Sequence, residues 1–145
     1  MTKYTLDTQM LIRAGRSNVE AERMYQSFSA SIFYLNSVVA HELLSGAHPG
    51  ELRELERGLL RPFEKRGRVV TPTHKAWRDA GRILYKLRKS GWQITPSLRN
   101  DVLIAVSSTQ VGATVVHDNA RDFDAIQRVY PRLQHHVGWP EREAA

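Results

Sequence analysis

Short apolar segments alternate with helical segments along the whole chain, and this alternation most strongly limits the folds open to it. Strands are expected at residues 3–6, 32–35, 68–71 and 113–116, with a weaker one at 134–137. Short, continuously apolar strands are typical of a parallel sheet that is buried on both faces. The sequence therefore predicts an α/β protein with three layers, α/β/α, around a mainly parallel sheet of four to five strands.

The helical segments between these strands carry start and stop signals. Ser17 and Glu20 have the spacing of a capping box, which predicts a helix from about there to Phe28. Gly91 suits the end of a long helix that Thr73 begins. The further helices are expected at residues 37–46, 51–60, 73–89, 98–110 and 123–129.

Composition narrows the class of protein. The 145 residues suit one domain, which we expect at 1–138, with 139–145 as a flexible C-terminal tail. No apolar run approaches the roughly 18–20 residues of a membrane span, and the N-terminus lacks the apolar core of a secretion signal. The absence of cysteine fits a reducing cytoplasm, where we expect the protein. The net charge of +6 favours a polyanionic partner such as nucleic acid.

Four acidic residues, far apart in the chain, lie in segments that otherwise have the composition of a core. They are Asp7, Glu42, Asp101 and Asp122. A buried carboxylate is costly unless a cation or hydrogen bonds offset its charge. In parallel sheets ligands bind beyond the carboxyl ends of the strands, where Asp7 and the segment 118–122 fall. Convergence of the four would create a site for Mg²⁺ or Mn²⁺, which prefer oxygen ligands.

Each acid also has a purely structural explanation. Asp7 would be a turn residue at a strand end, and Asp101 an acid in the first turn of a helix, where it suits the helix dipole. Glu42 would be a surface acid and Asp122 a helix cap. The four neighbourhoods taken together favour a shared site over four separate structural roles.

The order of these neighbourhoods resembles that of the PIN-domain nucleases, especially the VapC-like ribonuclease toxins of type II toxin–antitoxin systems. The segments that carry the resemblance are 6–8, 37–46, 100–105 and 115–123. The resemblance covers nearly the whole chain, from Tyr4 to about Val137. It implies a PIN-like domain and a Mg²⁺- or Mn²⁺-dependent endoribonuclease, with in-line attack of water on RNA that leaves a 5′-phosphate and a 3′-hydroxyl.

The resemblance also assigns roles to individual residues. It implies that the catalytic, metal-binding carboxylates are Asp7, Glu42, Asp101 and Asp122. Thr8 would support the first acid, and Asn119 would help to order the site. The sequence departs from the family pattern at His117 and Asp118, so Asp118 could replace or supplement Asp122 as the fourth acid. His117 would either contact the scissile phosphate or be a structural histidine at a strand end.

Basic residues suggest where RNA would lie. The expected RNA-binding residues are Arg82, Lys86, Lys89, Arg99 and Arg121. For the three on the predicted helix, the alternative is an ordinary solvated face.

The resemblance further implies a small antitoxin partner and a homodimer. An apolar groove for the antitoxin, or ordinary core packing, would account for Met10, Leu11, Met24, Leu52, Leu55, Leu59 and Leu60.

Two other functions compete with the nuclease. A PIN fold that binds RNA or protein without cutting remains open, although the complete set of acids argues against it. A phosphoacceptor receiver domain is also an α/β protein that binds Mg²⁺. It would need an acidic pair near the first strand and an acid after the third, whereas the chain offers only Asp7 and then Val69-Val70-Thr71-Pro72.

Overall fold

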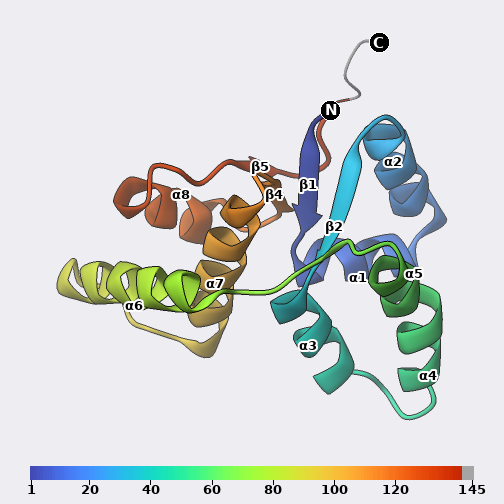
Figure 1. Cartoon of the computed structure of the whole chain (residues 1–145), viewed down its shortest axis with the longest axis horizontal. Helices are drawn as coiled ribbons and strands as arrows, with labels where there is room; N and C mark the ends of the chain where they lie inside the picture. The colour runs from blue at the N-terminus through green and yellow to red at the C-terminus, as the bar shows by residue number, and fades with distance from the viewer. Residues whose placement is uncertain (142–145) are drawn as a thin grey trace.

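The computed structural model describes residues 1–141 and confirms the predicted parallel α/β/α architecture (Figure 1). All five strands pair in parallel in the order β3-β2-β1-β4-β5. The strands are β1 (Lys3–Leu6), β2 (Ile32–Asn36), β3 (Val69–Val70), β4 (Thr114–His117) and β5 (His135–Val137). Because both β2 and β4 pair with β1, the order of the strands reverses beside β1, and such a switch point forms a crevice at the carboxyl edge of the sheet.

The helices cover both faces of this sheet (Figure 1). Those before β3 are α1 (Thr8–Arg16), α2 (Asn18–Phe28), α3 (Ser37–Ser45), α4 (Leu52–Glu54), the π-helical segment η1 (Leu55–Leu60) and α5 (Arg61–Lys65). Those after β3 are α6 (His74–Lys89), α7 (Pro96–Gln110) and α8 (Ala120–Val129). Within residues 1–141, no helix is both long enough and apolar enough to cross a membrane.

The structure adds one helix that the sequence analysis missed. Helix α1 follows β1 directly, and the Asp7 side chain caps it by accepting a hydrogen bond of 3.1 Å from the backbone N–H of Met10. The sequence analysis interpreted Asp7 as a turn residue at the end of a strand and therefore did not predict that it also caps a helix. The helix expected to end near residue 60 also continues through η1 and α5 to Lys65.

Two helix starts and one strand differ from the prediction. Thr95 caps α7 by accepting from the N–H of Leu98, so the helix begins at Pro96 and Asp101 lies in its second turn rather than its first. Asn119 caps α8, which therefore begins at Ala120 instead of residue 123. Strand β3 has only two residues where four were expected.

Apolar residues form a cluster on each face of the sheet. The larger cluster packs α3, α6, α7 and α8 against β2 and β4, with Leu35, Val102 and Val115 near its centre. The smaller cluster joins β1 and β4 to α1, and Met24 and Phe28 of α2 pack against it. Burial of these side chains on both faces is the main stabilising contribution to such a sheet.

A buried hydrogen-bond network fixes α7 across the two central strands. The hydroxyls of Thr5 (β1) and Ser108 (α7) are 2.8 Å apart, and the amide Nδ2 of Asn36 (β2) donates to Ser107 Oγ at 2.8 Å. Asn36 Oδ1 accepts from the N–H of Val38 and so caps α3. One side chain thus ties β2, α3 and α7 together.

The first two residues of the expected C-terminal tail contact helix α2. The Trp139 ring lies edge-on to Phe28 with centroids 6.0 Å apart, and its indole N–H donates to Glu20. Ser27 Oγ donates to the carbonyl oxygen of Pro140 at 2.7 Å. Trp139 and Pro140 therefore pack against α2, while the part of the expected tail at residues 142–145 lies outside the described residues.

Replacing Asn36 is expected to destabilise the fold strongly. The Asn36→Ala variant loses the cap of α3 and leaves buried hydroxyl partners without their donor, so we expect a cost of about 2–3 kcal/mol. Urea unfolding measures it, with the exposed Asn18→Ala on α2 as the matched control. Equal stabilities of the two variants would contradict the proposed role of the network.

Candidate active site

The four predicted acids come from different elements and meet at the carboxyl edge of the sheet. Asp7 follows β1, Glu42 lies in α3, Asp101 in α7 and Asp122 in α8. Asp7 and Asp101 are buried, with 6% and 8% of their surfaces exposed, while Glu42 and Asp122 are half-buried. The fold therefore gathers carboxylates where an α/β sheet normally binds its ligand.

Burial and mutual repulsion shift the titration of the two buried acids. Removal from water, together with the nearby charges of Asp7, Asp122 and Glu42, raises the pKa of Asp101 to about 8. Removal from water, with smaller effects of Asp118 and Glu42, raises the pKa of Asp7 to about 6, although the N–H of Met10 opposes this. Asp101 is thus within electrostatic range of the other three acids, and a cation would relieve the repulsion.

The two expected supporting residues each contact an acid, although Thr8 bonds to Glu42 and not to Asp7, the acid that it was expected to support. Thr8 Oγ1 donates a hydrogen bond of 2.8 Å to Oε1 of Glu42, and this bond links the start of α1 to α3. Asn119 Nδ2 donates to Oδ2 of Asp101 at 3.4 Å, while its Oδ1 accepts from the backbone N–H of Asp122. Asn119 therefore orients acids from two helices with one amide group.

Asp118 lies at the margin of the site. Its side chain is 41% exposed and is 3.8 Å from the guanidinium of Arg13, which also pairs with Glu20 at 3.1 Å. Its charge contributes to the raised pKa of Asp7, whereas Asp122 acts on Asp101. The sequence analysis missed Arg13, because nothing in the sequence of α1 indicates that it faces an acid more than one hundred residues away.

The chemistry of the candidate ligands suits a hard divalent cation. All candidate ligands are carboxylate oxygens, two of them buried beside like charges, as Mg²⁺ or Mn²⁺ would require. Within the part of the chain described, no three of the His, Asp and Glu side chains converge closely enough to form a ready-made metal cage. The carboxylates influence one another electrostatically without forming a closed set of ligands.

His117 is a buried structural residue at the end of β4 rather than a group open to a phosphate. It is completely buried and stacks on Phe123 with ring centroids 3.9 Å apart, and burial lowers its pKa to about 3. Its Nδ1 accepts from the N–H of Asn119 at 3.0 Å, so its Nε2 carries the proton and donates to His135 Nδ1 at 2.8 Å. A neutral histidine thus fixes the backbone of Asn119, the residue that orients Asp101 and Asp122.

The expected RNA-binding residues lie on three helices, α6, α7 and α8. Arg121 precedes Asp122, and its guanidinium is 4.8 Å from the ring centroid of Trp92, while Arg99 is exposed in α7. The other three, Arg82, Lys86 and Lys89, are exposed on α6.

Two adjoining apolar grooves lie between α1, α2 and the α4–η1 segment. One has a volume of about 540 Å³, reaches Glu42, and is lined by Leu11, Met24, Leu55 and Leu59. The other, of about 430 Å³, shares Leu11, Met24 and Leu59 and continues along Phe28 and Phe63.

Three of the seven residues expected to line a groove do not. Met10 and Leu60 are buried in the core, and Leu52 is exposed outside the groove.

Comparison with known proteins identifies the family. The model of the PIN domain matches residues 4–129. The tRNA(fMet)-specific endonuclease VapC of Shigella flexneri is 25% identical over 126 residues, which cover 87% of this chain and 93% of that protein.

Two solved structures share the fold. VapBC2 from Rickettsia felis, bound to a DNA fragment from its promoter, superposes with a TM-score of 0.69 at 22% identity, covering 94% of this chain and 98% of that one. DNA-bound VapBC from Salmonella typhimurium superposes with a TM-score of 0.67 at 24% identity, covering 97% of this chain and 100% of that one.

Without a divalent cation, stability is expected to fall as the pH rises from about 4 to about 8. The folded state holds protons on Asp101 and Asp7 that the unfolded chain releases near the ordinary pKa of 3.8. The stabilisation is therefore complete below that value and is lost as the pH passes through about 6 and about 8. Thermal unfolding in EDTA should show Asp101→Asn unfolding on the order of 5 °C above the unchanged protein at pH 8.

That advantage should shrink towards pH 5, where the native carboxyl is protonated. Glu56→Gln, at an exposed position in η1, should match the unchanged protein at both pH values. A melting temperature of Asp101→Asn at or below that of the unchanged protein at pH 8 would contradict the raised pKa.

Proposed function

Because this chain belongs to the PIN-domain family, we propose that it is a Mg²⁺- or Mn²⁺-dependent endoribonuclease, the toxin of a toxin–antitoxin pair. The observation that carries the proposal is the pair of buried carboxylates, Asp7 and Asp101, held beside further acids at the carboxyl edge of the sheet. A protein with a net charge of +6 that concentrates negative charge at one point has an arrangement suited to cations.

In this proposal Asp7, Glu42, Asp101 and Asp122 hold the cation, with Asp118 as a further acid at the margin. When bound, the cation supplies charge neutralisation at the phosphodiester and lowers the pKa of water. The chain itself positions the ligands. Thr8 holds Glu42, and Asn119 holds Asp101.

The protons on the carboxylates are part of the same function. At neutral pH the metal-free site retains a proton on Asp101, whose pKa is about 8. A cation held there would require the ionised carboxylate of Asp101. His117 keeps the backbone of Asn119 in place and is neutral, because burial lowers its pKa to about 3.

The substrate proposal is RNA, as for the tRNA endonuclease VapC to which the chain is similar. Arg121 directly precedes Asp122 and Arg99 lies two residues before Asp101, so both would contact phosphates flanking the scissile bond. Arg82, Lys86 and Lys89 would hold more distant phosphates. We propose a cytoplasmic homodimer, in keeping with this class of toxin.

The partner proposal is a small antitoxin that covers the two apolar grooves. The first groove runs from Leu55 and Leu59 to Glu42, so an apolar segment seated there would bring its end to the carboxylates. The solved relatives contain VapBC complexes, which supports a partner of this kind. A noncatalytic binding role is the alternative, while membership of the PIN family leaves the receiver domain without support.

Purified protein is expected to cut RNA at discrete positions in Mg²⁺ or Mn²⁺ and not in EDTA. Replacing a carboxylate with its amide keeps the shape but removes the charge, so Asp7→Asn and Asp101→Asn should lose about 100-fold or more of the rate. Total RNA is the first substrate, with fragment ends mapped, and Glu56→Gln is the control. Undiminished cleavage by Asp101→Asn would overturn the assignment, while metal binding without cleavage by the unchanged protein would favour the binding module.

The antitoxin groove can be tested by two substitutions in one helical segment. Leu55→Lys should leave RNA cleavage unchanged but weaken inhibition by the proposed antitoxin by about tenfold or more, because Leu55 lines the groove. Leu52→Lys, nearby but outside the groove, should leave both unchanged. Equal inhibition of the two variants would place the antitoxin elsewhere.

A further inference from the structure

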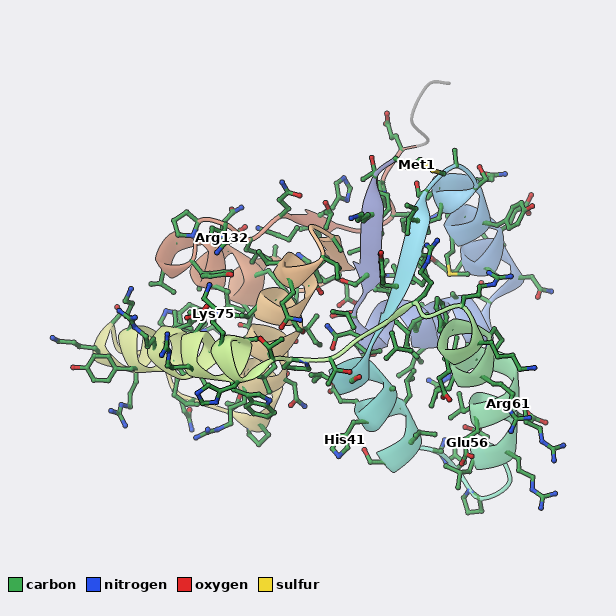
Figure 2. All side chains as sticks on the ribbon, in the orientation of Figure 1. Met1, His41, Glu56, Arg61, Lys75 and Arg132 are labelled. Carbon is green, nitrogen blue, oxygen red and sulfur yellow. The ribbon has the colours of Figure 1, made fainter. Side chains whose placement is uncertain are left out.

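The outer face of α6 concentrates positive charge more than helix stability requires. Six of the chain's 21 lysines and arginines lie exposed on this one helix: Lys75, Arg78, Arg82, Lys86, Arg88 and Lys89. Figure 2 shows nitrogen-tipped side chains projecting from this helix, including Lys75 near its start. The lone acid of α6, Asp79, is half-buried, and none of the six cations forms an ion pair with another described residue.

Five of these cations form a continuous row, which we call the cationic row. Its members are spaced by three, four, four and three residues, so they share one face: Lys75, Arg78, Arg82, Lys86 and Lys89. Like charges at these spacings repel and weaken a helix. The helix dipole favours the cations of the last turn, but it disfavours Lys75 in the first. The helix dipole thus accounts for the cations of the last turn but not for Lys75, Arg78 and Arg82, and the row as a whole fits a polyanion.

Beside this row lies a second row with two exposed aromatic rings. Trp77 and Tyr85 are 57% and 54% exposed, and Gly81 lies between them at a spacing of four residues from each. A glycine inside a helix weakens it, and a Cβ at Gly81 would meet no atom within 4 Å. Packing thus does not require a glycine at this position. Gly81 leaves open space between the two rings, which are about 12 Å apart along the helix.

This surface is connected to the carboxylate site. Helix α6 packs against α7 and α8, which carry Asp101 and Asp122. Trp92, just after the end of α6, lies under the guanidinium of Arg121, the residue before Asp122. Arg88 and Lys89 at that end of α6 lie about 6 Å from the Tyr85 ring centroid, at 5.9 and 6.0 Å. Cations and aromatic rings therefore extend from the first turn of α8 onto α6.

We propose that this face of α6 binds the unpaired nucleotides of an RNA strand whose scissile phosphodiester lies at the carboxylate site. The cationic row holds the phosphates, and bases stack on Trp77 and Tyr85, with Gly81 leaving room for a base between the rings. Unpaired bases are required, because the faces of paired bases inside a duplex are not accessible to side chains. The inference rests on the proposed ribonuclease function and assigns to it a second RNA-binding surface, outside the carboxylate site, on α6.

The test is equilibrium binding of a fluorescent, unstructured 12-nucleotide RNA, in EDTA and in an Asp101→Asn background so that cleavage does not interfere. The double variant Trp77→Ala/Tyr85→Ala should bind about tenfold or more weakly, whereas Trp77→Phe/Tyr85→Phe should restore most of the affinity. Binding of a blunt duplex of the same length should not depend on the rings. Tyr25→Ala, which removes a 74% exposed ring from α2, is the matched control and should have no effect.

Two further variants distinguish the contribution of the cationic row to RNA binding from that of the aromatic rings. Arg82→Gln/Lys86→Gln should reduce the slope of log affinity against log salt by about 0.7 for each lost phosphate contact. Gly81→Leu fills the space between the rings with a good helix former and should raise the melting temperature while weakening RNA binding. A variant that is more stable yet binds worse is not explained by damage to the fold.

Unchanged RNA affinity in Trp77→Ala/Tyr85→Ala would overturn the proposal, as would an equal loss for the duplex. Selective binding of anionic lipid vesicles by this face, with no effect of the variants on RNA, would overturn it too. Failure of the proposed function has a different signature. If the protein never cleaves RNA but binds it through these rings, the α6 proposal stands and the nuclease proposal fails. If the protein cleaves RNA and all α6 variants bind RNA normally, the nuclease proposal stands and the α6 proposal fails.

Discussion

The hydrogen-bond network of Thr5, Asn36, Ser107 and Ser108 is the constraint on which the candidate site depends. These groups are fully buried, and each finds its partner on another element. A buried polar group that loses its partner is costly, so the network admits one placement of α7 across β1 and β2. That placement fixes Asp101 of α7 relative to Asp7 after β1, and the cap that Asn36 forms fixes α3 with Glu42.

The site has an electrostatic cost that the apolar core does not. Burial and like charges raise the pKa of both Asp7 and Asp101, so the metal-free fold loses stability as the pH rises from about 4 to about 8. Hydrogen bonds from surrounding groups hold the acids in place despite this cost. Thr8 donates to Glu42 and Asn119 donates to Asp101, while His117 accepts from the backbone N–H of Asn119. Functional sites commonly retain such strain because the ligand relieves it.

The molecule presents surfaces of opposite character around these carboxylates. The grooves beside α1 and α2 are apolar and reach Glu42, which suits a protein segment. The face of α6 is cationic with exposed rings, and it connects to the site through Trp92 and Arg121. In the two proposals, the antitoxin and the RNA bind different faces of one domain. Both binding surfaces lead to the carboxylates.

The sequence by itself determined the layer architecture, the parallel sheet and the four segments that carry the acids, because strand and helix periodicity and capping are local signals. It did not reveal helix α1, since the Asp7 that caps it also reads as a strand-end turn residue. Only the tertiary structure decided that Asp118 lies beside Arg13, that His117 is a buried support for Asn119, and which of the predicted leucines line a groove. Those facts depend on how elements far apart in the chain pack together, and periodicity along one segment carries no information about what it will face.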